Sequence, residues 1–207
     1  MILFYMPGAC SLAVHIALRE AGLPFGLAEV SYGERLLRCG GDFRAINSKA
    51  YVPALKLDDG SLLTEVPVIL QYIDAVAPGA RLLPAAGNLS RYRALEWLNY
   101  VATEIHKSFS PLFRPSTPHD FLKPGRNHLA GRLDIVEARL VDTPYLSGAR
   151  FCLADAYLFT CCRWLGAQDL AIADWPALAR HFNIVGNRTT VAAALAAEGL
   201  PMPEPVT

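Results

Sequence analysis

Apolar runs and turn signals alternate along residues 1–80. The run Ile2–Tyr5 predicts a strand, the turn Pro7-Gly8 follows it, and apolar residues at helical spacing predict a helix over Ser11–Ala21. Gly22 stands where a helix C-cap belongs, and Phe25–Ser31 is a second strand candidate. Two strands with a helix between them predict a parallel βαβ unit.

A hairpin is predicted further along this region. Val52–Leu57 reads as a third strand, Asp58-Asp59-Gly60 is a strong turn signal, and Leu62–Thr64 reads as a fourth strand. A short helix is expected at 43–46, and a longer one from Glu65 to about Ala77. The parallel unit and the antiparallel pair together predict a mixed sheet covered by helices.

The pattern changes after residue 80. Prolines and glycines gather at 78–80 and 84–88, and we place the domain boundary there. Beyond it the apolar spacing predicts helices only, over residues 89–113, 128–140, 151–165, 175–182 and 190–197, with an extended tail at 201–207. The predicted fold class is α/β plus all-α, with one domain at 1–80 and an all-helical domain at 87–207.

Composition and charge narrow the classes of function. Charged residues make up 18% of the chain, below the usual share of about 25%. We therefore expect a large buried area, to which a subunit interface would contribute. The 19 basic and 19 acidic residues balance, so nothing favours nucleic acid or an anionic membrane as a partner.

The apolar runs and the cysteines indicate in which cellular compartment the protein is expected. No apolar run approaches the roughly 20 residues that a membrane span needs, and the N-terminus has no basic lead of a signal peptide. The 5 cysteines are odd in number and include no CxxC metal pair. We expect reduced thiols, a cytoplasmic location and no metal site.

Cys10 is the first candidate for chemistry. It lies in the first turn of a predicted helix, where unpaired N–H groups meet the positive end of the helix dipole. Such a place lowers the pKa of a thiol and favours the nucleophilic thiolate. A buried structural cysteine is the alternative. Because Pro7 and Ala13 occupy the positions three residues away, Cys10 has no CxxC partner, and a dithiol mechanism lacks its second sulfur.

Two other elements are weak by themselves. Pro53 removes a ladder donor at the start of a strand, and a cis peptide that turns Val52 toward a ligand is one reason to tolerate it. Thr64-Glu65 opens a helix whose N-terminus can bind an anion. A plain acidic residue in the first turn is the alternative for Glu65.

Four segments stand together in a recognisable order: Tyr5-Met6-Pro7-Gly8-Ala9-Cys10-Ser11, Val52-Pro53-Ala54-Leu55, Thr64-Glu65 and Ala154-Asp155-Ala156-Tyr157. With them, nearly the whole chain resembles a bacterial glutathione S-transferase of the beta class, which carries cysteine at this position. The resemblance implies a thioredoxin-like N-terminal domain, an all-helical C-terminal domain and a homodimer. It also implies a detoxification enzyme that conjugates glutathione, as co-substrate and without another cofactor, to small hydrophobic electrophiles.

The resemblance further implies a glutathione site. Cys10 is expected beside the glutathione sulfur, able to form a mixed disulfide with it, and Val52 is expected to offer its backbone to the cysteinyl part. Pro53 should be cis. Arg35 stands where the family carries a lysine for the glycine carboxylate, and it keeps the charge. Glu65 and the residue after it are expected to hold the γ-glutamyl end.

A long helix of the second domain is expected to add residues, partly from the neighbouring subunit. Asn99, Thr103 and His106 are spaced to share one face. His106 is expected to contact the thiol or its bound water, with a solvated helix histidine as the alternative. Lys107 is expected to add positive charge nearby, with a plain surface lysine as the alternative. The predicted catalytic residues are Cys10 and His106, and the predicted glutathione-binding residues are Tyr5, Ser11, Arg35, Tyr51, Val52, Pro53, Glu65, Val66, Asn99, Thr103, Glu104 and Lys107.

The chain departs from the family pattern at several positions. Val66 replaces the small or hydroxylic residue usual after the acid and loses a side-chain donor to the γ-glutamyl carboxylate, although its backbone N–H remains. One lost hydrogen bond to a charged group is worth roughly 1.5–3 kcal/mol. Ser48 and Ala50 replace the proline and glycine of the usual Asn-Pro-Lys-Gly segment. Cys152 is a poor helix N-cap. We therefore expect Asp155 to rely on backbone donors and to act in folding.

Other functions stay open at this point. A glutaredoxin-like thiol-disulfide oxidoreductase needs only a monothiol and a glutathione site. A low-turnover protein that binds glutathione and hydrophobic ligands is a third reading. Aromatic residues are candidates for the walls of a hydrophobic pocket between the domains, with core packing as the alternative; they are Tyr5, Phe109, Phe113 and Trp164.

Overall fold

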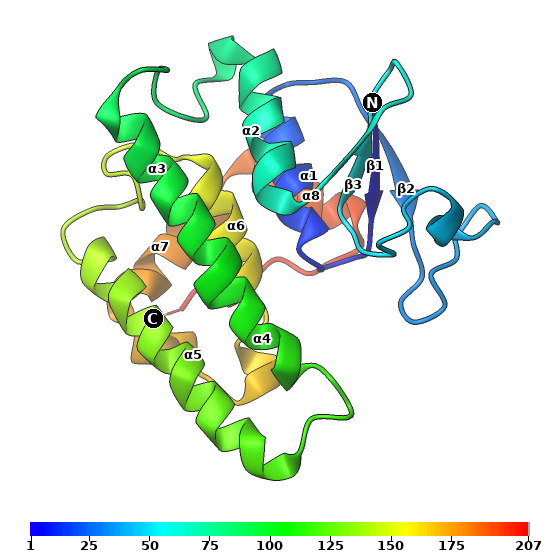
Figure 1. Cartoon of the computed structure of the whole chain (residues 1–207). Helices are drawn as coiled ribbons and strands as arrows, with labels where there is room; N and C mark the ends of the chain where they lie inside the picture. The colour runs from blue at the N-terminus through cyan, green and yellow to red at the C-terminus, as the bar shows by residue number, and fades with distance from the viewer. Residues whose placement is uncertain (207) are drawn as a thin grey trace. The chain divides into compact units, whose positions relative to one another are not determined.

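The computed structural model describes residues 1–206 and divides them into two compact units (Figure 1). The first unit holds residues 1–82 together with 189–202, and the second holds 83–188 and the tail from 203. The expected division put everything after residue 87 in the helical domain. The structure differs because helix α8 (Thr189–Ala197) packs against α1 (Ser11–Glu20) in the first unit.

The first unit is built on the predicted mixed sheet. Its strands are β1 (Ile2–Tyr5), β2 (Gly26–Glu29), β3 (Ala54–Lys56) and β4 (Leu62–Thr64), in the order β2-β1-β3-β4. β1 and β2 pair in parallel around α1, whereas β3 is antiparallel to both β1 and β4. The βαβ unit and the Asp58-Asp59-Gly60 hairpin are thus confirmed, with shorter strands than expected.

Side chains on the two faces of the sheet enter different clusters. Phe4 pairs with Ala28 and Ala54 across the sheet, and it joins Phe43 of the short helix η1 (Phe43–Ala45) in one buried cluster. Leu3 is fully buried and alternates to the opposite face, as the period of two requires. The helices α1, α8 and α2 (Val66–Val76) cover that side of the sheet (Figure 1).

A buried carboxylate joins α8 to the turn before α1. Glu198 and His15 have fully buried side chains, and His15 Nδ1 lies 2.8 Å from Glu198 Oε1. Because Arg19 Nε donates to His15 Nε2 over 2.9 Å, the imidazole proton lies on Nδ1 and is donated to Glu198. Glu198 Oε2 accepts the Gly8 N–H over 2.9 Å. One carboxylate therefore holds α8, α1 and the Pro7-Gly8 turn together.

The second unit is helical. Its elements are α3 (Leu89–Tyr100), the π-helical segment η3 (Val101–His106), α4 (Lys107–Leu112), α5 (His119–Leu140), α6 (Leu153–Cys162) and α7 (Pro176–Gly186). Short 3-10 turns lie at Gly166–Gln168 and Ile172–Asp174 in this unit, and another lies at Pro78–Ala80 in the first unit. Strands are absent from the described part of this unit, as expected.

Two predicted helix boundaries in this unit differ from the structure. The single helix expected at 89–113 is divided by the π-helical segment. The hydroxyl of Thr103 in this segment donates to the carbonyl of Asn99, one turn earlier in α3, over 3.1 Å. Helix α5 begins at His119 rather than 128, because Pro124 lies inside it without ending it. Pro124 is the sixth residue of α5, so it removes one helical hydrogen bond, the one that an N–H at this position would donate to the Asp120 carbonyl.

Asp155 anchors the buried helix α6, as expected from the sequence. Its carboxylate accepts the N–H of Leu146 over 2.9 Å and that of Cys152 over 2.7 Å. The sequence did not reveal a third partner, His181 of α7, whose Nε2 lies 2.9 Å from Asp155 Oδ1. All of these groups lie in the interior of the helical unit.

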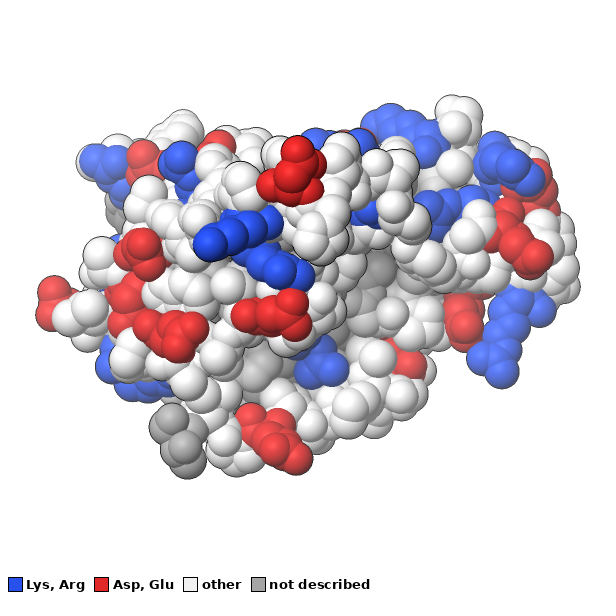
Figure 2. All heavy atoms as spheres, turned by 90° about the horizontal axis from the view of Figure 1, so that it is seen from below, with Lys and Arg blue, Asp and Glu red and all other residues white. Residues whose placement is uncertain are grey.

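Charge is dispersed over the face of the molecule in Figure 2. Basic and acidic side chains are interspersed there among uncharged surface, and neither sign forms a continuous patch. Within residues 1–206 no helix combines the length and apolar character required to cross a bilayer.

We expect Asp155→Ala to lower the free energy of unfolding by about 3–5 kcal/mol, because two buried N–H groups lose their acceptor. Urea unfolding followed by circular dichroism measures the change. Asp142→Ala, at an exposed position on the same unit, is the control and should change stability by about 0.5 kcal/mol or less. A loss below about 1 kcal/mol in Asp155→Ala would contradict the anchoring role.

Candidate functional site

Cys10 lies at the junction between the first turn and α1, where the sequence predicted it. Its Sγ donates to the backbone carbonyl of Val52 over 3.3 Å, so the structure brings Cys10 and Val52 together. Ser11 holds the turn closed, because the Met6 N–H donates to its Oγ and its hydroxyl donates to the Met6 carbonyl, each over 3.2 Å. Ser11 is fully buried and thus acts on the turn.

The Cys10 thiol is less acidic than the helix start suggested. Burial raises its pKa to about 12, and the negative charge of Glu65 acts in the same direction. The N–H groups of Cys10 and Ser11 lower the pKa but are outweighed. The expected depression of this pKa is therefore wrong, because desolvation of the thiolate exceeds the effect of the helix N-terminus. At neutral pH Cys10 is a neutral thiol and a hydrogen-bond donor.

Glu65 is exposed at the start of α2, in an unusual conformation. Its φ of 70° and ψ of 120° are costly for a residue other than glycine. Its carbonyl accepts the N–H groups of Val68 and Ile69 over 3.1 and 3.0 Å and so begins the helix. The backbone is held in place while the carboxylate points to solvent, as a ligand-binding carboxylate requires.

The residue after Glu65 contributes backbone only. Val66 is 4% exposed and packs its side chain into the core, which accounts for an apolar residue at this position. Pro67 follows it and has no N–H. The Val66 N–H is the first of α2 and has no helical acceptor, so it is the backbone donor that this helix start offers.

Lys49 is a site neighbour that the sequence did not reveal. Its Nζ lies 2.8 Å from Glu65 Oε1 and 2.9 Å from Thr64 Oγ1. The buried Asn47 organises the loop, since it donates to the Tyr51 carbonyl over 2.8 Å and accepts the Lys49 N–H over 3.2 Å. In the sequence, only the unusual residues on either side of Lys49, Ser48 and Ala50, drew attention to this loop.

The loop residue Ala50 adopts a φ of 57°, in the left-handed region where the family carries glycine. Tyr51 is 68% exposed, and only its carbonyl is engaged by Asn47. The Val52-Pro53 peptide is cis, as expected from the resemblance. The loop therefore presents Val52 in the conformation that the family pattern implied.

Arg35 and Tyr5 both lie near the turn that precedes Cys10. Arg35 has a φ of 62°, and its Nη1 lies 3.4 Å from Met6 Sδ, which places its guanidinium beside the turn that precedes Cys10. Tyr5 is 6% exposed, and burial together with Glu29 raises its pKa. Of these two, Arg35 is the group with a charge to offer a ligand, whereas Tyr5 packs in the core.

The predicted residues of the helical unit divide into two groups. Asn99, Thr103 and Lys107 are exposed and spaced by four, whereas His106 is half-buried and its Nδ1 is hydrogen-bonded to the Tyr157 hydroxyl. The predicted common face of Asn99, Thr103 and His106 stays a prediction, and the π-helical segment lies between its two ends. Glu104 lies 3.6 Å from Arg132.

His106 belongs to an aromatic cluster. Its ring centroid lies 5.6 Å from Tyr157 and 5.2 Å from Trp164, and Trp164 in turn contacts Phe109 and Phe113 edge-on. Burial lowers the pKa of His106 to about 4, with a further contribution from Lys107. The imidazole is therefore neutral at pH 7. Phe109 is core, as the alternative reading held, while Phe113 is 43% exposed.

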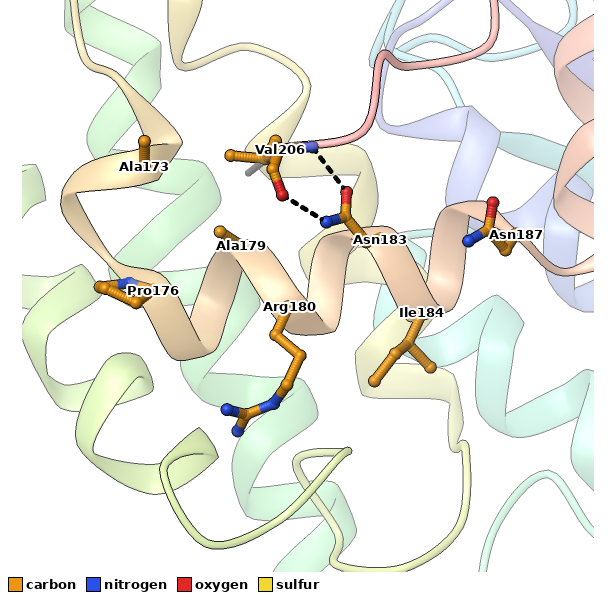
Figure 3. A pocket seen from close by; sticks show the side chains of 8 residues that line it. All are labelled: Ala173, Pro176, Ala179, Arg180, Asn183, Ile184, Asn187 and Val206. Atoms are coloured by element: carbon orange, nitrogen blue, oxygen red, sulfur yellow. Dashed lines mark hydrogen bonds between the residues drawn. The ribbon is translucent and has the colours of Figure 1, made fainter.

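A hollow of about 390 Å³ lies elsewhere on the helical unit, against α7 (Figure 3). The side chain of Asn183 holds the tail beside it, donating to the Val206 carbonyl over 2.8 Å and accepting the Val206 N–H over 3.0 Å. Arg180 donates to the Leu140 carbonyl at the end of α5. The lining contains none of the predicted site residues and no nucleophile, so this hollow does not compete with Cys10 as the chemical centre.

Among residues 1–206, no three His, Cys, Asp or Glu side chains gather where they could ligate a metal ion. None of the five cysteines, all of which lie within residues 1–206, forms a disulfide; only Cys39 is exposed, and Cys10 is half-buried. The chemistry available near Cys10 is therefore that of a neutral thiol, an exposed carboxylate and nearby cations.

Comparison with known proteins finds a family match for the N-terminal part of the chain and another for the C-terminal part. Residues 8–76 match the family model for the glutathione S-transferase N-terminal domain, and residues 100–189 match that for the C-terminal domain. The chain is 47% identical over 200 residues to glutathione S-transferase GstA of Escherichia coli O157:H7, across 97% of this chain and 100% of that protein.

Solved structures agree with these sequence matches. A sphingomonad glutathione S-transferase complexed with glutathione has a TM-score of 0.93 and 40% identity, across 97% of this chain and 100% of that one. The beta class glutathione S-transferase of Sphingomonas chungbukensis has a TM-score of 0.93 and 39% identity over the same shares. The fold is thus the thioredoxin-like and helical pair that the sequence predicted.

Because burial raises the Cys10 pKa, we expect slow alkylation of this thiol in the ligand-free protein. With a pKa near 12, about one thiol in 10,000 is ionised at pH 8. Iodoacetamide labelling read by peptide mass spectrometry should modify Cys10 slowly at pH 8 and much faster above pH 10, with the exposed Cys39 as internal control for the reagent. Equal labelling of both residues at pH 7 would contradict a neutral Cys10.

His106 should titrate near pH 4, which NMR of its imidazole measures, with the resonance assigned from His106→Gln. Between pH 6.5 and 4 the unfolded chain binds a proton at this residue that the folded protein excludes. The free energy of unfolding is therefore highest, as far as His106 is concerned, above pH 6.5, and it decreases as the pH falls from 6.5 toward 4. A midpoint between pH 6 and 7 would contradict the burial of this ring.

Proposed function

This chain belongs to the glutathione S-transferase family, and on that premise we propose that it conjugates glutathione to small hydrophobic electrophiles. Glutathione acts as co-substrate, and we propose no further cofactor. The relatives named above support this reaction over the glutaredoxin-like and carrier readings, since they are transferases over the full length of the chain. A homodimer, a cytoplasmic location and a role in detoxification are typical of the family and belong to the same proposal.

The observation that carries the proposal is the neutral Cys10 thiol held at the Val52 carbonyl. The Val52 N–H meets no acceptor among the described residues. We propose that the cysteinyl backbone of glutathione pairs with the Val52 backbone, as two extended strands do. The Val52 carbonyl then accepts a hydrogen bond from the ligand N–H in place of the one from the Cys10 thiol. The released Cys10 S–H turns to the glutathione sulfur and donates to it.

In this arrangement Cys10 donates a hydrogen bond and keeps its proton. Such a bond stabilises the glutathione thiolate, whose own proton leaves to solvent. The thiolate attacks the electrophile, a carbon–sulfur bond forms, and the leaving group departs with its electron pair. A mixed disulfide of Cys10 requires its thiolate instead, which burial disfavours. Thiol-disulfide exchange is therefore secondary in this proposal.

Charged ends of the tripeptide have partners in the same unit. Glu65 faces solvent and suits the γ-glutamyl ammonium, and the Val66 N–H suits the neighbouring carboxylate. Arg35 suits the glycine carboxylate, since its guanidinium already lies beside the turn at Met6. The remaining predicted residues are Asn99, Thr103, Glu104, His106 and Lys107, which the family places partly on the neighbouring subunit.

Cys10→Ala tests the proposal. Loss of one hydrogen bond to a charged group, roughly 1.5–3 kcal/mol, should lower kcat/KM for conjugation of a chlorodinitrobenzene by about 10–150-fold. It should also move the pH profile of kcat/KM to higher pH, because the bound thiolate is less stable. Cys39→Ala, at an exposed loop cysteine, is the matched control and should leave both unchanged.

Calorimetric titration with glutathione and a disulfide-reductase assay complete the test. Absence of glutathione binding by the wild type would overturn the proposed function. Full conjugation by Cys10→Ala with loss of disulfide reduction would assign Cys10 to exchange and not to conjugation. Binding without either activity in the wild type would favour the carrier reading.

A further inference from the structure

Lys49 already occupies the carboxylate that the proposed function assigns to a ligand. Its Nζ contacts Glu65 Oε1 at 2.8 Å and Thr64 Oγ1 at 2.9 Å. The side chains of Lys49 and Glu65 are 53% and 62% exposed, so water and salt screen this ion pair. An ammonium arriving at Glu65 therefore displaces Lys49 at little cost.

The Lys49 backbone is held by the loop, whereas its side chain is held by two exposed contacts at the ammonium, to Glu65 and Thr64. Asn47 accepts the Lys49 N–H, and the Ala50 N–H donates to the Asn47 carbonyl over 2.8 Å, which closes the loop. The side chain has four methylenes and an ammonium with three donors, two of which are in use. A displaced Lys49 ammonium can reach another acceptor nearby without moving the loop.

The start of α2 is short of donors for a carboxylate. Val66 has no hydroxyl and packs into the core, and Pro67 has no N–H. The Val68 N–H donates to the Glu65 carbonyl over 3.1 Å. One backbone N–H, that of Val66, is left for a carboxylate that has two oxygens and about four acceptor positions. A second donor with positive charge would complete the subsite.

The chemistry of a γ-glutamyl group places its two charges together. Its α-ammonium and α-carboxylate are attached to the same carbon, so an ammonium on Glu65 puts the carboxylate within reach of the cation that Glu65 has just released. Each charge then has an opposite partner: ammonium with Glu65 and carboxylate with Lys49. Before binding, Glu65 and Lys49 pair with each other.

We propose that Lys49 is the side chain that binds the α-carboxylate of the γ-glutamyl group, in place of the hydroxyl missing at Val66. In the ligand-free protein it rests on Glu65 and Thr64, and it changes partner when glutathione binds. This inference rests on the proposed function and deepens it, because it assigns a specificity residue for free α-amino acid ends of the substrate.

Two analogues of glutathione test this pairing against Lys49→Gln. Aminobutyryl-Cys-Gly keeps the ammonium and lacks the α-carboxylate, whereas glutaryl-Cys-Gly keeps the carboxylate and lacks the ammonium. Calorimetry should show that Lys49→Gln raises Kd for glutathione and for glutaryl-Cys-Gly about fivefold. It should not raise Kd for aminobutyryl-Cys-Gly. Lys49→Arg, which keeps the charge, should restore most of the affinity for glutathione.

Lys56→Gln is the matched control, since it removes the same charge from an exposed lysine on β3 of the same unit. It should leave all three Kd values unchanged. Raising the salt concentration should also weaken glutathione binding more in the wild type than in Lys49→Gln, because a screened ion pair is lost.

The remaining outcomes overturn the proposal in distinguishable ways. Tighter glutathione binding by Lys49→Gln would make Lys49 a competitor for Glu65 only. Equal weakening of glutathione and aminobutyryl-Cys-Gly would make its role structural, through the loop at Asn47. An unchanged Kd for glutathione would overturn this inference alone, whereas a wild type that does not bind glutathione would overturn the proposed function as well.

Discussion

The hydrogen bonds of the buried Glu198 carboxylate are the constraint on which the thioredoxin-like unit depends. Glu198 accepts one hydrogen bond from His15 of α1 and one from the Gly8 N–H of the turn. Arg19 balances its charge through the same imidazole. Because Cys10 follows Gly8 by two residues, a carboxylate near the end of the chain positions the turn that carries the thiol. A buried carboxylate left without these donors would be strongly destabilising, so the three elements keep one arrangement.

Burial also decides the chemistry of the two titratable residues proposed to be catalytic. The helix start favours a thiolate at Cys10, but loss of hydration is the larger effect and keeps the thiol neutral. At His106 loss of hydration keeps the imidazole neutral. Both groups are thus donors or acceptors without charge. The charges near Cys10 are those of Glu65, Lys49 and Arg35, which are exposed or half-exposed and available to a charged tripeptide.

Much of the fold follows from local pattern. The period of two in β1, the Asp58-Asp59-Gly60 turn and the helical spacing in α1 depend on neighbours in sequence, and each was predicted within a few residues. The segments that carry the resemblance predicted Cys10, Val52 and Glu65 as site residues, and the structure places the Cys10 thiol on the Val52 carbonyl. The division of the helix at 101–106 was missed, because apolar residues still recur at spacings near four through a π-helical segment.

The sequence by itself determined the elements of the sheet, the family and the residue types at the site, because these are properties of local order and spacing. Only the tertiary structure decided which residues meet across long separations: His15 with Glu198, Asp155 with His181, and Lys49 with Glu65. It also decided the protonation of Cys10, since desolvation depends on what packs around a group and not on its neighbours in the chain.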